Sequence, residues 1–177
     1  DRVHLFKKQA GTGSWLPMQT LSNPNSSNDV FGWSVDLDGG ILAVGAPEYN
    51  RQNGGGSNDG CVWVYQLDAL AQWSLIQSPQ LLSSAPSSNG DAFGHSVSVF
   101  GDTIAVGSPE YTNQSFSEGS VYTFRDFLNQ NTASQQNETY QISNPLPSAN
   151  AGFGEAVSLS SYTLVTGSPG DNLAYVW

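Results

Sequence analysis

Two Glu-Tyr pairs are the residues best suited to hold a ligand. Glu48-Tyr49 and Glu110-Tyr111 occupy equivalent places, each pair directly after a proline. A carboxylate beside a phenol can hold a sugar or a basic side chain, because the ring offers an apolar face while the carboxylate accepts hydrogen bonds. We therefore predict ligand binding at Glu48, Tyr49, Glu110 and Tyr111. The alternative is that they are ordinary solvated loop residues.

Residue patterns for catalysis are scarce. The two histidines, His4 and His95, lie far apart in the chain, which gives little support to a histidine-based metal site. The string from Gly94 to Ser98 resembles a nucleophile elbow, but it has Ser where the second Gly is required. We predict no catalytic residue, no metal site and no enzymatic activity.

Three asparagines begin an N-x-S/T sequence and are candidate N-glycosylation sites: Asn25, Asn113 and Asn137. They are about as many as chance produces in a chain this rich in Asn, Ser and Thr. They permit a secreted origin without arguing for it. Cys61 is the only cysteine, so no intrachain disulfide can form, and we expect it to be a small buried hydrophobe.

Composition and charge exclude several classes of partner. Charged residues make up 11% of the 177 residues, and the formal net charge is −10. A surface this acidic repels phosphate backbones, so we expect neither nucleic acid nor an anionic membrane as partner. No apolar run is long enough for a membrane span, so we expect no membrane insertion, and no signal peptide is evident.

Two short motifs recur three times at matched spacing. Phe-Gly begins at Phe31, Phe93 and Phe153, separations of 62 and 60 residues. Gly-x-Pro begins 14 residues after each of these phenylalanines, at positions 45, 107 and 167. A fixed core with variable spacing outside it is typical of a structural repeat joined by loops.

Each copy predicts a four-stranded antiparallel sheet. Alternating apolar residues such as Val35 and Leu37 predict a first strand. Two-residue turns are predicted at 39–40 and 101–102, whereas Ser161-Tyr162 is a poor turn former and predicts another turn type. Consecutive apolar residues then predict a second strand covered on both faces and ended by the proline.

Two further strands complete the predicted copy. Third strands are expected around 62–65, 121–124 and 174–177, and fourth strands around 73–76 and 140–142. The same two strands of an earlier copy are expected at 3–6 and 15–21. One large aromatic residue per third strand is expected to fill the gap between neighbouring sheets: Phe6, Tyr65, Phe124 and Trp177.

The strings FGWSVDLDGGILAVGAP, FGHSVSVFGDTIAVGSP and FGEAVSLSSYTLVTGSP resemble the FG-GAP repeat, known from the head of integrin α-subunits and from bacterial and algal surface proteins. The resemblance implies an extracellular or cell-surface β-propeller that binds proteins or glycans. Several integrin repeats also hold calcium in an acidic loop between the first two strands. That loop is cut here to about two residues, with only Asp36 and Asp38 beside it. Because calcium needs six to eight oxygen ligands, we expect none at this hairpin and no other cofactor. The longer loops from Glu48 to Asp59 and from Glu110 to Glu118 carry scattered oxygen atoms, so calcium stays an alternative there.

The predicted fold is therefore all-β, with about three four-stranded antiparallel FG-GAP blades. Residues 1–30 are assigned to strands three and four of a preceding blade, 31–92 and 93–152 to full blades, and 153–177 to an incomplete blade. Because propellers typically have four to eight blades, we expect this segment to belong to a larger propeller. Its missing neighbours are the remaining blades of the same chain or neighbouring subunits.

Three functions fit this reading. The first is an extracellular recognition or adhesion propeller that binds protein or glycan through its loops. The second is a structural subunit of a glycosylated surface filament or extracellular matrix. The third is a non-catalytic accessory domain of a secreted hydrolase.

Overall fold

The computed structural model describes residues 1–25, 28–50, 58–83, 90–113, 116–125 and 140–177. Within these residues the regular structure is β-strand apart from one short 3-10 turn, η1 (Pro169–Asp171). None of the described residues belongs to a helix long and apolar enough to cross a membrane. The prediction of an all-β chain is confirmed.

Two four-stranded antiparallel sheets form the middle of the molecule. In each sheet the strands are hydrogen-bonded side by side in chain order. The first full blade consists of β3 (Val35–Asp38), β4 (Ile41–Ala46), β5 (Cys61–Leu67) and β6 (Trp73–Leu81). The second full blade consists of β7 (Ser96–Phe100), β8 (Thr103–Ser108), β11 (Ser120–Arg125) and β12 (Tyr140–Ser143).

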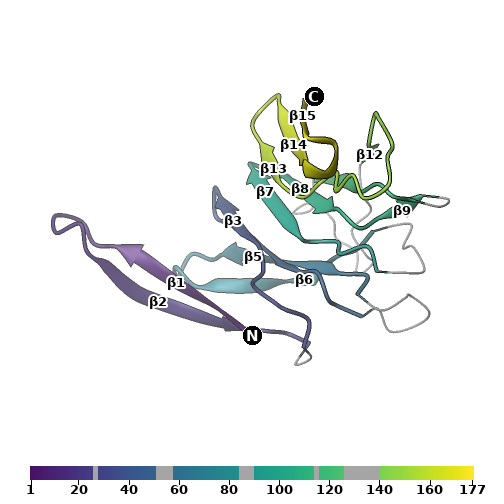
Figure 1. Cartoon of the computed structure of the whole chain (residues 1–177). Helices are drawn as coiled ribbons and strands as arrows, with labels where there is room; N and C mark the ends of the chain where they lie inside the picture. The colour runs from purple at the N-terminus through teal and green to yellow at the C-terminus, as the bar shows by residue number, and fades with distance from the viewer. Residues whose placement is uncertain (26–27, 51–57, 84–89, 114–115, 126–139) are drawn as a thin grey trace.

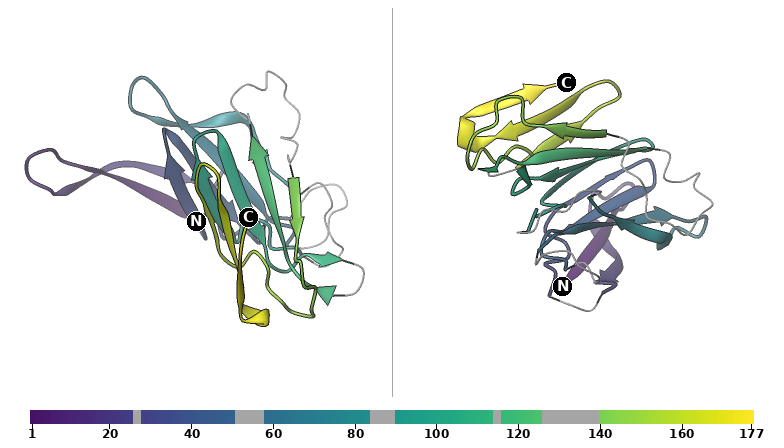
Figure 2. Two further views of the ribbon diagram at one scale, coloured as in Figure 1. Left: turned by 90° about the horizontal axis from the view of Figure 1, so that it is seen from above. Right: turned by 90° about the vertical axis from the view of Figure 1, so that its right-hand side faces the viewer.

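Smaller sheets lie at the two ends. The N-terminal hairpin pairs β1 (Arg2–Lys8) with β2 (Trp15–Ser22) and projects from the body of the molecule (Figure 1). The C-terminal sheet consists of β13 (Val157–Leu159), β14 (Leu164–Ser168) and β15 (Leu173–Val176). A two-residue ladder between β9 (Thr112–Asn113) and β10 (Phe116–Ser117) lies in the loop after β8 and was not predicted. The sheets follow one another from the N-terminal hairpin to the C-terminal sheet (Figure 2).

The turn between the first and second strands has three different forms. Gly39 and Gly40 both have positive φ, of 55° and 91°, as the two-residue turn from β3 to β4 requires. Gly101 alone has positive φ in the matching turn from β7 to β8. In the turn from β13 to β14, Ser160 N–H donates to the Thr163 carbonyl over 2.8 Å, and neither Ser161 nor Tyr162 has positive φ. Both two-residue turns and the different third turn are as predicted.

The second and third strands are buried on both faces because each full blade packs between two neighbours. In β4, Ile41 and Ala43 belong to the core shared with the second full blade. Leu42 and Val44 belong to the core shared with the N-terminal hairpin. A smaller core around Phe153 lies between the second full blade and the C-terminal sheet. Face-to-face packing of successive sheets is the arrangement of propeller blades.

The expectation for the third-strand aromatics is right for the full blades and wrong at the ends. Tyr65 and Phe124 are buried, at 4% and 1% exposure. Phe6 is 53% exposed, and Trp177, which follows β15, is 48% exposed. Tyr65 and Phe124 lie on strands that have a partner strand on each side, whereas among the described residues β1 pairs only with β2 and β15 only with β14.

Candidate functional site

Each repeat opens with a turn that presents one side chain at the same end of its sheet. The residue after Phe-Gly donates its backbone N–H to the carbonyl three residues earlier, over 3.0 to 3.1 Å. The glycine at the third position of the turn has φ between 90° and 95°, which a type II turn requires there. The residues presented by the three turns are Trp33, His95 and Glu155.

Hydrogen bonds hold these turns in place within and between blades. Each Phe-Gly glycine donates its N–H to the first glycine of its own Gly-x-Pro motif, over 3.0 to 3.1 Å. The Ser34 hydroxyl donates to the carbonyl of Gly94 over 2.7 Å, and Ser96 does the same to Gly154. Each turn in the two full blades is therefore tied to the next turn along.

The three presented side chains form a row across neighbouring blades. The rings of Trp33 and His95 lie 5.4 Å apart between centroids, at a tilt of 52°. His95 Nε2 lies 3.9 Å from Glu155 Oε1. Trp33 is 57% exposed, so one face of an aromatic ring is open to solvent at the end of the row.

Two hollows flank His95. One of about 200 Å³ is lined by Trp33, Glu48 and Glu110, among others. The second, of about 440 Å³, is lined by Glu110 and Glu155. Three carboxylates thus line the two hollows beside His95, and no Lys or Arg is among the described residues that line either hollow. The site can accept hydrogen bonds and attract a cationic group.

The four predicted ligand-binding residues divide into two groups. Glu48 and Glu110 are exposed and line the hollows. Tyr49 is 8% exposed, and its ring packs edge-on against Trp63 at 6.3 Å. Tyr111 is half-buried and packs in the same way against Tyr122. The carboxylates face the site while the phenol rings pack into the sheets, and a ligand role for any of the four stays a prediction.

The two acidic residues beside the first hairpin serve the next blade. Asp36 Oδ2 accepts hydrogen bonds from Val99 N–H at 2.7 Å and from the Ser98 hydroxyl at 3.2 Å. Asp38 Oδ2 accepts one from Gly101 N–H at 2.8 Å. Among the described residues, no group of three or more His, Cys, Asp and Glu side chains is placed to hold a metal ion.

Two of the three candidate glycosylation sites lie among the described residues. Asn25 is half-buried, and its Nδ2 donates to Asp29 Oδ2 over 3.1 Å. Asn113 is the second residue of β9. Asn137 lies outside the described residues. Glycosylation at each of them stays a prediction.

Sequence reasoning did not nominate Trp33, His95 and Glu155 as a site. They hold the same position in each copy, but because their residue types differ, the sequence indicates a variable residue at the entry to the first strand and not a site. The sequence feature that indicates the site is the position of these residues, because each directly follows a Phe-Gly pair. Equivalent positions of stacked repeats lie at the same end of their sheets.

Comparison with known proteins supports the repeat assignment. Residues 21–65 and 81–124, together half of the chain, match the FG-GAP repeat. These two segments contain the motif copies that begin at Phe31 and Phe93. No curated protein matches the sequence.

Proposed function

Because the chain belongs to the FG-GAP repeat family, we propose that it is a recognition or adhesion propeller of the cell surface or extracellular space. FG-GAP repeats form β-propeller domains that are often involved in binding or adhesion. The ligand is a protein or a glycan, bound through the loops at the end of the blades that carries the row of Trp33, His95 and Glu155. The chain acts by binding and not by catalysis.

The observation that supports this function is the open aromatic ring beside three carboxylates. An exposed indole can stack on a sugar ring or on a guanidinium group. The carboxylates of Glu48, Glu110 and Glu155 can accept hydrogen bonds from sugar hydroxyls or pair with a basic side chain. Ser96 follows His95 and stands where a nucleophile elbow has its serine. Its hydroxyl donates a hydrogen bond to the Gly154 carbonyl, which supports a structural role for Ser96.

The test begins with arrays of extracellular-matrix proteins and of oligosaccharides, probed with the labelled chain. Each bound compound is then titrated against Trp33→Ala, Glu110→Gln and the control Trp15→Ala. Trp15 is a similarly exposed tryptophan, at 64%, on the N-terminal hairpin. We expect Trp33→Ala to weaken binding by about tenfold or more, because aromatic residues at the centre of an interface carry much of its affinity.

Two results contradict the proposal. The first is an array ligand whose dissociation constant is unchanged by both Trp33→Ala and Glu110→Gln. The second is chemical conversion of the bound compound, detected by mass spectrometry, which would make the chain an enzyme.

A further inference from the structure

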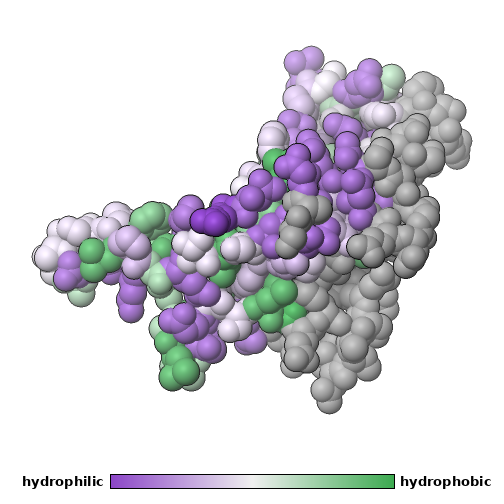
Figure 3. Space-filling view, turned by 90° about the horizontal axis from the view of Figure 1, so that it is seen from below, coloured by the Kyte–Doolittle hydropathy of each residue, from purple (hydrophilic) through white to green (hydrophobic). Residues whose placement is uncertain are grey.

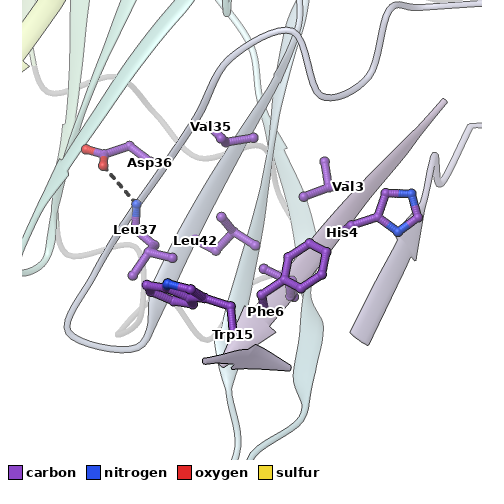
Figure 4. A pocket seen from close by; sticks show the side chains of 9 residues that line it. Val3, His4, Phe6, Trp15, Val35, Asp36, Leu37 and Leu42 are labelled. Carbon is purple, nitrogen blue, oxygen red and sulfur yellow. Dashed lines mark hydrogen bonds between the residues drawn. The ribbon is translucent and has the colours of Figure 1, made fainter. Parts of the chain in front are cut away.

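An apolar groove runs beside the N-terminal hairpin, between β1 and the first full blade. It has a volume of about 650 Å³. The side chains around it come from β1, β2, β3 and β4 (Figure 4). Four of them are more than half exposed: Phe6, Trp15, Val35 and Leu37. The hairpin itself stands clear of the body, with apolar side chains among polar ones (Figure 3).

The repeat shows what covers the equivalent surface elsewhere in the same molecule. Val35 and Leu37 are 52% and 56% exposed, while their counterparts Val97 and Val99 are 8% and 5% exposed. Val97 and Val99 are buried in one core with Ile41, which comes from the second strand of the preceding blade. The groove therefore lies where a second strand would cover Val35 and Leu37.

The backbone hydrogen bonds of the first strand also differ between the groove and the later blades. Val99 N–H donates to Asp36 of the preceding blade at 2.7 Å, and Leu159 N–H donates to Ser98 of the preceding blade at 3.1 Å. At the groove, the equivalent N–H of Leu37 donates to the carboxylate of its own neighbour, Asp36, at 2.9 Å (Figure 4). The acceptor that a preceding blade supplies elsewhere is replaced by a local one.

The strand that borders the groove has an open edge. The equivalent strands β5 and β11 pair with a strand on each side. Within the described residues, β1 pairs with β2 alone. It also carries Arg2, Lys7 and Lys8, three of the five basic residues of this acidic chain. Open strand edges readily pair with an added strand.

We propose that this groove is the docking site of a β-hairpin with the FG-GAP pattern. Its return strand pairs antiparallel with β1 and places a branched aliphatic and a small side chain over Val35 and Leu37. We expect the docked strand to pair with β1 in the same register in which β4 pairs with β5. Its residue equivalent to Ala43 then lies opposite Leu5, and its residue equivalent to Ile41 lies opposite Lys7. The groove continues the apolar core already formed by the hairpin and the first full blade. Acidic residues like Asp36 and Asp38 on the docked hairpin suit the basic strand.

The experiment supplies such a hairpin in the same polypeptide. A second copy of residues 31–60 is joined directly before Arg2, because Gly60 directly precedes the equivalent strand β5. We expect the melting temperature to rise by about 5 °C or more, since buried apolar area stabilises the fold. Hydrogen exchange of the β1 amides should slow at the same time. The matched control carries Ile41→Asp in the added copy only and should show neither change.

Two outcomes overturn the proposal. One is an extended chain whose melting temperature and β1 exchange equal those of the control. The other is that the unextended chain sediments as a dimer that Leu37→Asp disperses, which would assign the groove to a second copy. Leu146→Asp, at a residue that is 60% exposed away from the groove, controls for loss of surface hydrophobicity. The inference is independent of the proposed function, because the readout is stability and not ligand binding.

Discussion

At the scale of single residues, the first glycine of the Gly-x-Pro motif lies against the backbone of the next blade in two of the three copies. A Cβ on Gly45 would overlap the carbonyl oxygen of Gly94, and one on Gly107 would overlap that of Gly154. A Cβ on Gly167 would meet only the Ala156 side chain, at an ordinary 3.8 Å. Gly167 can therefore accept a side chain that Gly45 and Gly107 cannot, although all three glycines occupy the same position of the motif.

Substitution of these glycines tests the closeness of the blades. Gly107→Ala should lower the free energy of unfolding by about 2 kcal/mol or more, because backbone must shift to admit the methyl group. Gly167→Ala should change it by less than about 0.5 kcal/mol. Urea denaturation followed by tryptophan fluorescence measures both. Equal losses for the two variants would show that blade contact is not the reason for the glycine.

Asp171 is expected to contribute to stability in a pH-dependent way. Hydrogen bonds from Ser148, Asn144 and Ser168 lower the pKa of its carboxyl below the ordinary 3.8. A lowered native pKa means that the contribution is complete above the unfolded value and is lost as the pH falls through the native value. The stability difference between the unmodified chain and Asp171→Asn should therefore shrink from pH 6 to pH 2.5 in denaturant titrations. Asp102→Asn, in the exposed turn after β7, serves as control.

At the scale of strands, the first strand of one blade supports the first strand of the next. Asp36 accepts hydrogen bonds from Val99 N–H and the Ser98 hydroxyl, and Ser98 accepts one from Leu159 N–H. Asp36→Ala should cost about 1–3 kcal/mol of unfolding free energy, because a partly buried N–H loses a charged acceptor. Asp38→Ala removes only an exposed bond to Gly101 and should cost less. Equal costs in urea denaturation would contradict this role.

The strands and turns could be predicted from the sequence because they depend on residues that are close together in the chain. Gly39 and Gly40 both adopt positive φ in their turn, whereas Ser161 and Tyr162 do not, so the third turn is of a different type. Burial of the third-strand aromatics was predicted correctly only for Tyr65 and Phe124, because burial depends on neighbouring sheets and not on the strand itself.

The candidate site was only partly predictable for a similar reason. Glu48 and Glu110 follow a repeated proline, so their equivalence could be read from sequence. The contact between Trp33 and His95 joins residues 62 positions apart and is created by the angle between two blades. Alternating residue types carry no information about that angle.

At the scale of the whole molecule, stability should be uneven. Each blade contacts only its neighbours. We therefore expect a sheet that is covered on both faces to open less often than a sheet that is covered on one face. In hydrogen exchange, amides of β4, β5, β8 and β11 should be the slowest, and those of β1, β2 and β13 to β15 the fastest. Uniform protection across all sheets would contradict a stack of semi-independent blades.

The core between the two full blades also predicts a difference between two equivalent phenylalanines. Phe93 is fully buried against Tyr122 and Phe124, with ring centroids 5.3 and 6.0 Å away. Phe153, also fully buried, lies in the smaller core at the C-terminal sheet. Phe93→Ala should lower the free energy of unfolding by about 3–5 kcal/mol. The main unfolding transition should therefore shift to a lower denaturant concentration. Phe153→Ala should mainly speed exchange in β13 to β15.

The sulfur atom of Cys61 sits at the first position of β5, wholly shielded in the core that Leu5 and Leu21 of the N-terminal hairpin share. An alkylating reagent can reach it only after that core opens. The rate at which a chromogenic thiol reagent reacts with Cys61 should therefore report how often that core opens, with no probe introduced into the chain.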